Sequence, residues 1–163
     1  MVSAAGASDV CVLTVVGVPQ PQGSKTAYVR NGRAVVTEGR TSAARENVAE
    51  WRRAVSDAAR AWVAKHDHAP WDCALEAEFG FWFSRPSSLP KREQYARRKP
   101  DLSKLIRAAE DALTGIVYVD DARLVRIVAT KAYTAGAPGA RISVRPFMRA
   151  LDGVRVGTLR CTS

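Results

Sequence analysis

Apolar residues at a spacing of two predict most of a β-sheet. The β-branched run at Val10–Val18 stops at two prolines, and Leu75–Phe83 alternates strictly between two faces. Ala27–Thr37 holds an Asn-Gly pair between two short apolar stretches, the strongest short-range signal for a hairpin. Arg123–Tyr133 and Arg141–Phe147 have the composition of two further strands.

Apolar residues at a spacing of three and four predict two helices. The first starts after a cap at Thr41 or Ser42 and runs to about Lys65. Its buried face is expected to consist of Ala44, Val48, Trp51, Val55, Ala58, Ala59 and Trp62, so both tryptophans are expected in the core. The second helix spans Ser103–Thr114, with Ser103 as N-cap and Gly115 as the stop signal.

These elements predict an α/β (α+β) fold: a single compact domain with a mixed β-sheet and two principal helices packed on it. A length of 163 residues suits one domain. We expect a flexible N-terminus over residues 1–8, the folded domain over 9–150, and a tail or edge strand over 151–163. The segment Ser84–Lys99 is rich in proline and basic residues, which predicts an exposed loop.

The charge points to a polyanionic partner. The chain has 25 Lys and Arg against 16 Asp and Glu, a net charge of +9. Proteins with such an excess of positive charge usually bind nucleic acid. No apolar run reaches the ~18 residues of a membrane span, and no signal peptide is expected. Three widely spaced cysteines without a C-x-x-C pair argue against zinc and against a disulfide framework, and favour a reducing, cytoplasmic setting. His66-Asp67-His68 is expected to be an extended loop with its two imidazoles on opposite sides, and not a metal site.

Acidic residues gather directly after the basic loop. Five of the sixteen fall within 21 residues: Asp101, Glu110, Asp111, Asp120 and Asp121. Carboxylates beside a phosphate-attracting surface suit Mg²⁺, which prefers oxygen ligands and assists phosphodiester hydrolysis. The competing interpretation is that these acids cap helices and pair with Lys104, Arg107 and Arg123. The spacing alone leaves both interpretations open.

Three motifs in order resemble the signature of the RusA-type Holliday junction resolvases, which reads K-P-D-x-D-N-L-x-K, D-A-L and D-D-A-x-V. The matching segments are KPDLSKLIR at 99–107, DALT at 111–114 and DDAR at 120–123. Lys131 also fits a basic position that often follows on the next strand. The resemblance implies a small α/β fold, a symmetric homodimer, and Mg²⁺-dependent nicking of four-way junctions in DNA recombination and repair, with Mn²⁺ as the alternative ion.

The same resemblance implies site residues by position. Asp101 and Asp121 match two of the three metal-binding catalytic carboxylates, Asp120 is a helper at the metal, and Arg107 stands where the family has a functional lysine. Arg107 keeps the positive charge but cannot donate a proton near neutral pH. The catalytic set is therefore expected to be Asp101, Asp120, Asp121 and Arg107.

Ser103 is the main departure, because the family has its second aspartate there. Two substitutes are conceivable: Ser103 binds a metal-bound water, or Glu110, seven residues on and nearly on the same helical face, leans back towards the site. Asp111 matches a helix aspartate of the family, in a catalytic or a structural role. The remaining alternative is a junction-binding relative that has lost catalysis.

The expected partners are branched DNA and a second copy of the chain, with no membrane, in a bacterial or phage-infected cell. Contacts to the DNA backbone are expected from Lys25, Arg85, Lys91, Arg92, Arg97, Arg98, Lys99, Lys104 and Lys131. A third interpretation is a general basic DNA- or RNA-binding domain, although most aromatic residues fall at core-periodic positions.

Overall fold

The computed structural model describes residues 10–23, 25–38, 41–90 and 92–147, with side chains left out over 25–30 and 34–38. The expected terminal segments, residues 1–8 and 151–163, lie outside this range. In chain order the elements are β1 (Cys11–Val16), β2 (Lys25–Arg30), β3 (Arg33–Glu38), α1 (Ser42–His66), β4 (Leu75–Ser84), α2 (Leu102–Leu113), the 3-10 turn η1 (Asp121–Arg123), β5 (Leu124–Thr134) and β6 (Gly139–Pro146).

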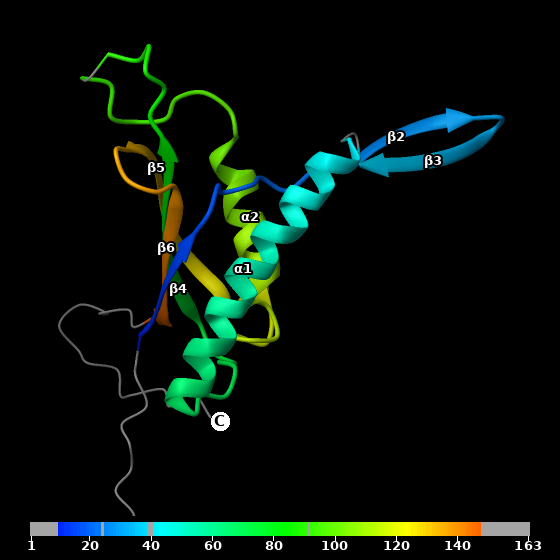
Figure 1. Cartoon of the computed structure of the whole chain (residues 1–163). Helices are drawn as coiled ribbons and strands as arrows, with labels where there is room; N and C mark the ends of the chain where they lie inside the picture. The colour runs from blue at the N-terminus through cyan, green and yellow to red at the C-terminus, as the bar shows by residue number, and fades with distance from the viewer. Residues whose placement is uncertain (1–9, 24, 39–40, 91, 148–163) are drawn as a thin grey trace, which may run out of the picture.

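The main sheet is mixed, as expected. Its strand order is β1-β6-β4-β5, with β4 and β5 parallel and the other two pairings antiparallel. The parallel pair is joined through α2, because parallel neighbours need a crossover connection. Both helices lie on the same side of the sheet (Figure 1). The predicted α+β architecture, one sheet with two helices packed on it, is confirmed.

The core lies between the helices and one face of the sheet. Alternate residues of β4 are buried there, including Phe79 at 1% and Phe81 at 0% exposure. Helix α1 contributes Trp51 and Trp62, which confirms that its tryptophans are core residues. Each large apolar side chain buried in this way contributes about 1.5–3 kcal/mol, so the predicted periodicities also identify the main stabilising contacts.

The Asn-Gly hairpin forms as predicted. Asn31 and Gly32 both have positive φ, 52° and 71°, as a two-residue turn that follows the strand twist requires. Strands β2 and β3 project from the body beside the start of α1 (Figure 1). Lys25 opens β2, and its side chain lies outside the described part.

Helix α2 begins one residue earlier than predicted. Asp101, not Ser103, is the N-cap: its backbone is extended, and its carbonyl accepts the first helical hydrogen bond from Leu105 N–H at 3.2 Å. Ser103 is therefore inside the first turn and exposed. The Asp101 side chain makes no capping hydrogen bond, so it is the extended backbone of Asp101, directly after Pro100, that sets the start of the helix.

The two histidines are not placed on opposite sides of an extended loop, contrary to expectation. His66 is the last residue of α1 and stacks on Trp62 with ring centroids 4.5 Å apart. His68 meets the same ring edge-on at 5.0 Å. The two rings therefore pack against one indole and do not point to opposite sides of an extended segment, because α1 continues past Lys65.

Cysteine chemistry differs from expectation as well. Cys11 is a buried free thiol, whereas Cys73 is disulfide-bonded. The spacing of the cysteines argued against a disulfide framework and did not identify Cys73 as a bonded residue. Across the described residues, no helix has the length and apolarity to cross a membrane.

Candidate functional site

The exposed face of α2 carries the motif residues. Ser103 and Arg107 are one turn apart and both exposed, and Glu110 follows on the same face, half-buried. The opposite face is buried through Leu105, Ala108, Ala109, Ala112 and Leu113. The amphipathic pattern of this helix therefore orients the motif side chains away from the core.

Asp101 lines a cleft at the start of α2. Its carboxylate pairs with the Lys104 ammonium at 3.2 Å, and its side chain is 49% exposed. The cleft has a volume of about 500 Å³ and is lined by Val18, Pro19, Gln20, Pro21, Phe83, Lys99, Pro100, Asp101 and Lys104. A hydrogen bond from Gln22 N–H to the Lys104 carbonyl at 2.8 Å ties the two walls together. The Asp101 carboxylate and the Lys104 ammonium thus meet in a cleft that Lys99 also lines.

Lys131 on β5 holds the segment that leads into this cleft. Its ammonium donates to the carbonyls of Arg98 and Pro100, both at 2.7 Å. The backbone N–H of Ala96 in turn donates to the Lys131 carbonyl at 3.3 Å. Lys131 was expected to contact DNA, and its ammonium is bound to the loop directly before Asp101.

Asp120 and Asp121 are placed by the buried segment before them. Trp71 N–H donates to Val117 O at 3.0 Å, and Val119 N–H donates to Trp71 O at 3.1 Å. Asp120 Oδ1 accepts from Ala122 N–H at 2.8 Å and so caps η1. The Asp121 side chain is exposed and makes no hydrogen bond or ion pair with the other described residues.

The Asp121 carboxylate interacts electrostatically with Glu110 of α2. Burial raises the pKa of Glu110, the carboxylates of Asp121 and Asp111 raise it further, and Arg107 opposes the shift. Burial first, then Glu110 and Asp121, also raise the pKa of the Tyr118 hydroxyl, which donates to the Glu110 carbonyl at 3.3 Å. The second half of α2 therefore carries mutually repelling negative charge.

Asp111 has a partner of its own on the other helix. Its carboxylate pairs with the Arg52 guanidinium of α1 at 3.1 Å. Of the two roles considered for Asp111, this contact favours the structural one, since it ties α2 to α1. The pairing could not be found by spacing, because the two residues belong to separate helices.

The donor set suits a hard divalent cation, but the carboxylates are spread out. No three His, Cys, Asp or Glu side chains within the described ranges are grouped so as to hold one ion. Asp101, Asp120 and Asp121 are thus not gathered into a single cluster. Mg²⁺ needs only one or two carboxylates, since water and substrate phosphate complete its shell. Glu110 and Asp121 repel each other, and a divalent cation bound nearby would offset that repulsion.

The loop between β4 and α2 supplies the exposed positive charge. Arg92, Arg98 and Lys99 are exposed, and Arg97 is exposed but pairs with Glu93. Arg85 is half-buried and donates to the Pro90 carbonyl at 3.0 Å. Lys91 lies outside the described residues.

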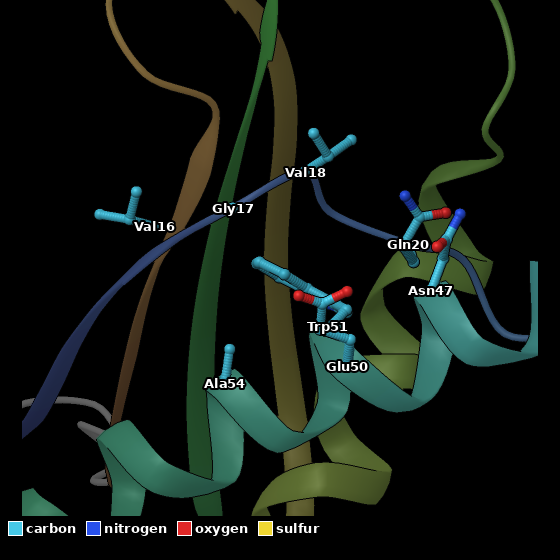
Figure 2. A pocket seen from close by; sticks show the side chains of 8 residues that line it. All are labelled: Val16, Gly17, Val18, Gln20, Asn47, Glu50, Trp51 and Ala54. Carbon is cyan, nitrogen blue, oxygen red and sulfur yellow. The ribbon is translucent and has the colours of Figure 1, made fainter.

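Another hollow belongs to a different part of the molecule (Figure 2). It lies between the end of β1 and the first half of α1 and has a volume of about 320 Å³. Its polar lining is Gln20, Asn47 and Glu50, with Trp51 at the floor and no lysine or arginine. This hollow therefore does not extend the basic surface.

Two residues of the site were missed by the sequence. Arg52 was assigned no role, although its place on the predicted α1 is consistent with an outward-facing cation. Tyr95 was not assigned a role either, and it is 62% exposed within the basic loop. Its place between a proline-rich stretch and an arginine pair was the sequence signal that could have indicated an exposed aromatic residue.

Comparison with known proteins decides the family. The family model for Endodeoxyribonuclease RusA matches residues 18–145. The chain belongs to the RusA family. RusA proteins are endodeoxyribonucleases, hydrolases that cut DNA phosphodiester bonds, and the family implies binding and resolution of Holliday junctions. They are generally dependent on a divalent metal. The match spans the cleft at Asp101, the exposed face of α2 and η1. No curated protein matches the chain.

Proposed function

We propose that this RusA-family chain is a Mg²⁺-dependent, structure-specific endodeoxyribonuclease that resolves four-way junctions by paired, symmetric nicks. The observation that carries the proposal is the cleft at the start of α2, which Asp101, Lys99 and Lys104 line together. Lysine ammonium groups attract a phosphodiester, and a carboxylate beside them can hold a divalent cation or its bound water.

Asp101, Asp121 and Asp120 are the proposed metal ligands, with Glu110 supplying the charge that Ser103 lacks. When bound, Mg²⁺ polarises the phosphoryl oxygen and stabilises charge on the leaving oxygen. The chain itself orients the phosphate with Lys104 and Arg107. Because Arg107 stays protonated, its part is electrostatic and does not involve proton transfer.

The loop arginines are proposed to grip the DNA backbone. Arg92, Arg97, Arg98 and Lys99 are exposed, and cations of this kind bind phosphates without reading sequence. Lys25, Arg85 and Lys91 are proposed to extend the same contact. Affinity should then fall steeply with salt, since each neutralised phosphate releases counterions.

We propose that the working form is a homodimer in the cytoplasm of a bacterial or phage-infected cell. Paired nicks on opposite strands need two sites at a fixed separation, and a two-fold dimer supplies them.

A second function, binding of branched DNA without cleavage, is favoured by one observation. Ser103 is exposed on α2 where a carboxylate would complete the metal site, and the described acids form no group of three. A hydroxyl adds no negative charge, so a metal held there would be bound more weakly.

The deciding experiment compares nicking of a synthetic four-way junction and a linear duplex, in Mg²⁺ and in EDTA. Wild type is tested beside Asp121→Asn, with Asp57→Asn as the control, because Asp57 is an exposed acid on α1 paired with Arg60. Nicks confined to the junction that need both Mg²⁺ and Asp121 support the nuclease. Tight junction binding without nicks supports the second function, and equal affinity for junction and linear duplex contradicts both.

A further inference from the structure

A small hollow on the basic loop shares no lining residue with the cleft at Asp101. It has a volume of about 170 Å³ and is lined by Leu89, Glu93, Tyr95, Arg97, Arg98 and Tyr133. Two aromatic rings, two guanidinium groups and one carboxylate therefore meet in one place. The loop that carries this hollow runs from the end of β4 to the start of α2 (Figure 1).

The Tyr95 ring is exposed although its backbone is held. Tyr95 pairs with Ala132 in an antiparallel bridge beside β5, and Tyr133 N–H donates to the Gln94 carbonyl at 2.8 Å. Its neighbour Ala96 is buried at 6% exposure, whereas Tyr95 is 62% exposed. A large apolar ring kept in water on a fixed backbone gains nothing for folding, which suggests that it contacts a partner.

The groups around the ring match the chemistry of a nucleotide. The Arg85 guanidinium covers one face of Tyr133, 5.6 Å from the ring centroid. Glu93 Oε2 accepts from Arg97, while Oε1 accepts no hydrogen bond from the described residues and can take one from a base amino group. An aromatic face for stacking beside cations for the flanking phosphates is the usual arrangement for single-stranded nucleic acid.

The volume of the hollow limits what it can bind to a single nucleobase. Pockets for drug-sized molecules begin at ~300 Å³, so a hollow of about 170 Å³ does not hold a whole nucleotide. Arg98 in its wall and Asp101 in the cleft are three residues apart, which an extended chain spans in at most about 11 Å. A base held here would belong to the nucleotides around the phosphate that enters the cleft.

We propose that this hollow binds one unstacked nucleobase of branched DNA, which stacks on Tyr95 and donates an amino hydrogen to Glu93. The inference rests on the proposed junction-resolving function and gives its site a means of recognising the branch point. Bases in an intact duplex must be unstacked at a cost of a few kcal/mol, and less where pairing and stacking are already interrupted. The hollow therefore favours the branch point over continuous duplex.

The test uses the full chain and a four-way junction with 2-aminopurine at the branch point or ten base pairs into one arm, in EDTA to prevent nicking. Wild type, Tyr95→Phe and Tyr95→Ala are compared, with Val16→Ala as the control because Val16 is 72% exposed on the opposite edge of the sheet. Tyr95 is exposed, so its variants should fold, and circular dichroism verifies this.

We expect wild type, Tyr95→Phe and Val16→Ala to change the 2-aminopurine fluorescence at the branch point only. Tyr95→Ala should lose that signal and bind the junction on the order of tenfold more weakly, the effect of one stacked base. Its affinity for linear duplex should stay unchanged. Loss of affinity for both DNAs, or no loss for either, overturns the inference.

Failure of the inference and failure of the proposed function give different results. If wild type nicks the junction in Mg²⁺ and Tyr95→Ala keeps the fluorescence change, the base site is wrong and the nuclease stands. If wild type does not distinguish the junction from linear duplex, both are wrong.

Discussion

Replacing Lys131 with methionine separates a positioning role from a DNA-binding one. The Lys131 ammonium donates to two carbonyls of the loop before α2, at 2.7 Å each. Methionine keeps most of the stem but leaves both carbonyls without this donor. Hydrogen bonds from charged groups contribute about 1.5–3 kcal/mol each, and water can replace the bond to the exposed Arg98 carbonyl. We therefore expect a total loss of about 2 kcal/mol.

Urea and thermal unfolding measure this loss directly. For a chain of this length, about 2 kcal/mol corresponds to a fall in melting temperature of about 4–8 °C. Lys65→Met is the matched control, since Lys65 is an exposed residue in the last turn of α1. It removes the same charge without touching the loop and should leave stability within about 0.5 kcal/mol of wild type.

In Lys131→Met, the rate of junction nicking should fall while the affinity for linear duplex is kept. Because Lys131 fixes the approach to Asp101, nicking of a junction should fall by tenfold or more, while affinity for linear duplex changes no more than in Lys65→Met. A Lys131→Met protein with wild-type stability and weakened binding to every DNA would refute the reasoning. Lys131 would then be a phosphate contact, as the sequence suggested.

Four further outcomes are expected. Ser103→Asp should raise Mg²⁺-dependent nicking, and an unchanged or lower rate would mean that the site is built around serine. Glu110→Gln should be more stable than wild type at pH 7, because the raised pKa of Glu110 means that folding opposes its ionisation; urea unfolding should show this gain vanishing as pH falls below the unfolded pKa near 4.5. Glu76→Gln should lose about 1 kcal/mol at pH 7, because two arginines lower the pKa of this carboxyl; a loss that persists at acid pH, below the folded pKa, would contradict the ionic cause. Gly139→Ala should lose about 1–3 kcal/mol in thermal unfolding, since its Cβ would lie 2.3 Å from the Val15 carbonyl oxygen, and wild-type stability would exclude that clash.

Local patterns predicted the secondary elements and the order of the motifs. The hairpin at Asn31-Gly32, the buried face of α1 and the alternation of β4 depend on contacts between residues a few positions apart, so the sequence contains them directly. The placing of Ser103, Arg107 and Glu110 on one face of α2 follows from the same helical spacing. The start of α2 was harder, because Asp101 and Ser103 are both good caps and only the backbone at Pro100 and Asp101 decides between them.

Electrostatic partners could not be predicted in this way. Asp111 pairs with Arg52, Lys131 with the carbonyls before Asp101, and Asp121 acts on Glu110, and each contact joins different elements. The sequence indicated which groups were available but not which would meet.

What the sequence by itself determined about this protein was its family, its elements and the candidate acids of the site. The tertiary structure decided the strand order, the separation of Asp101 from the acids near η1, and the exposure of the Tyr95 ring on a fixed backbone. The physical reason is the distance along the chain over which each interaction acts. Periodicity and capping act within one or two turns of chain, whereas packing joins segments whose separation along the sequence carries no information about their distance in space.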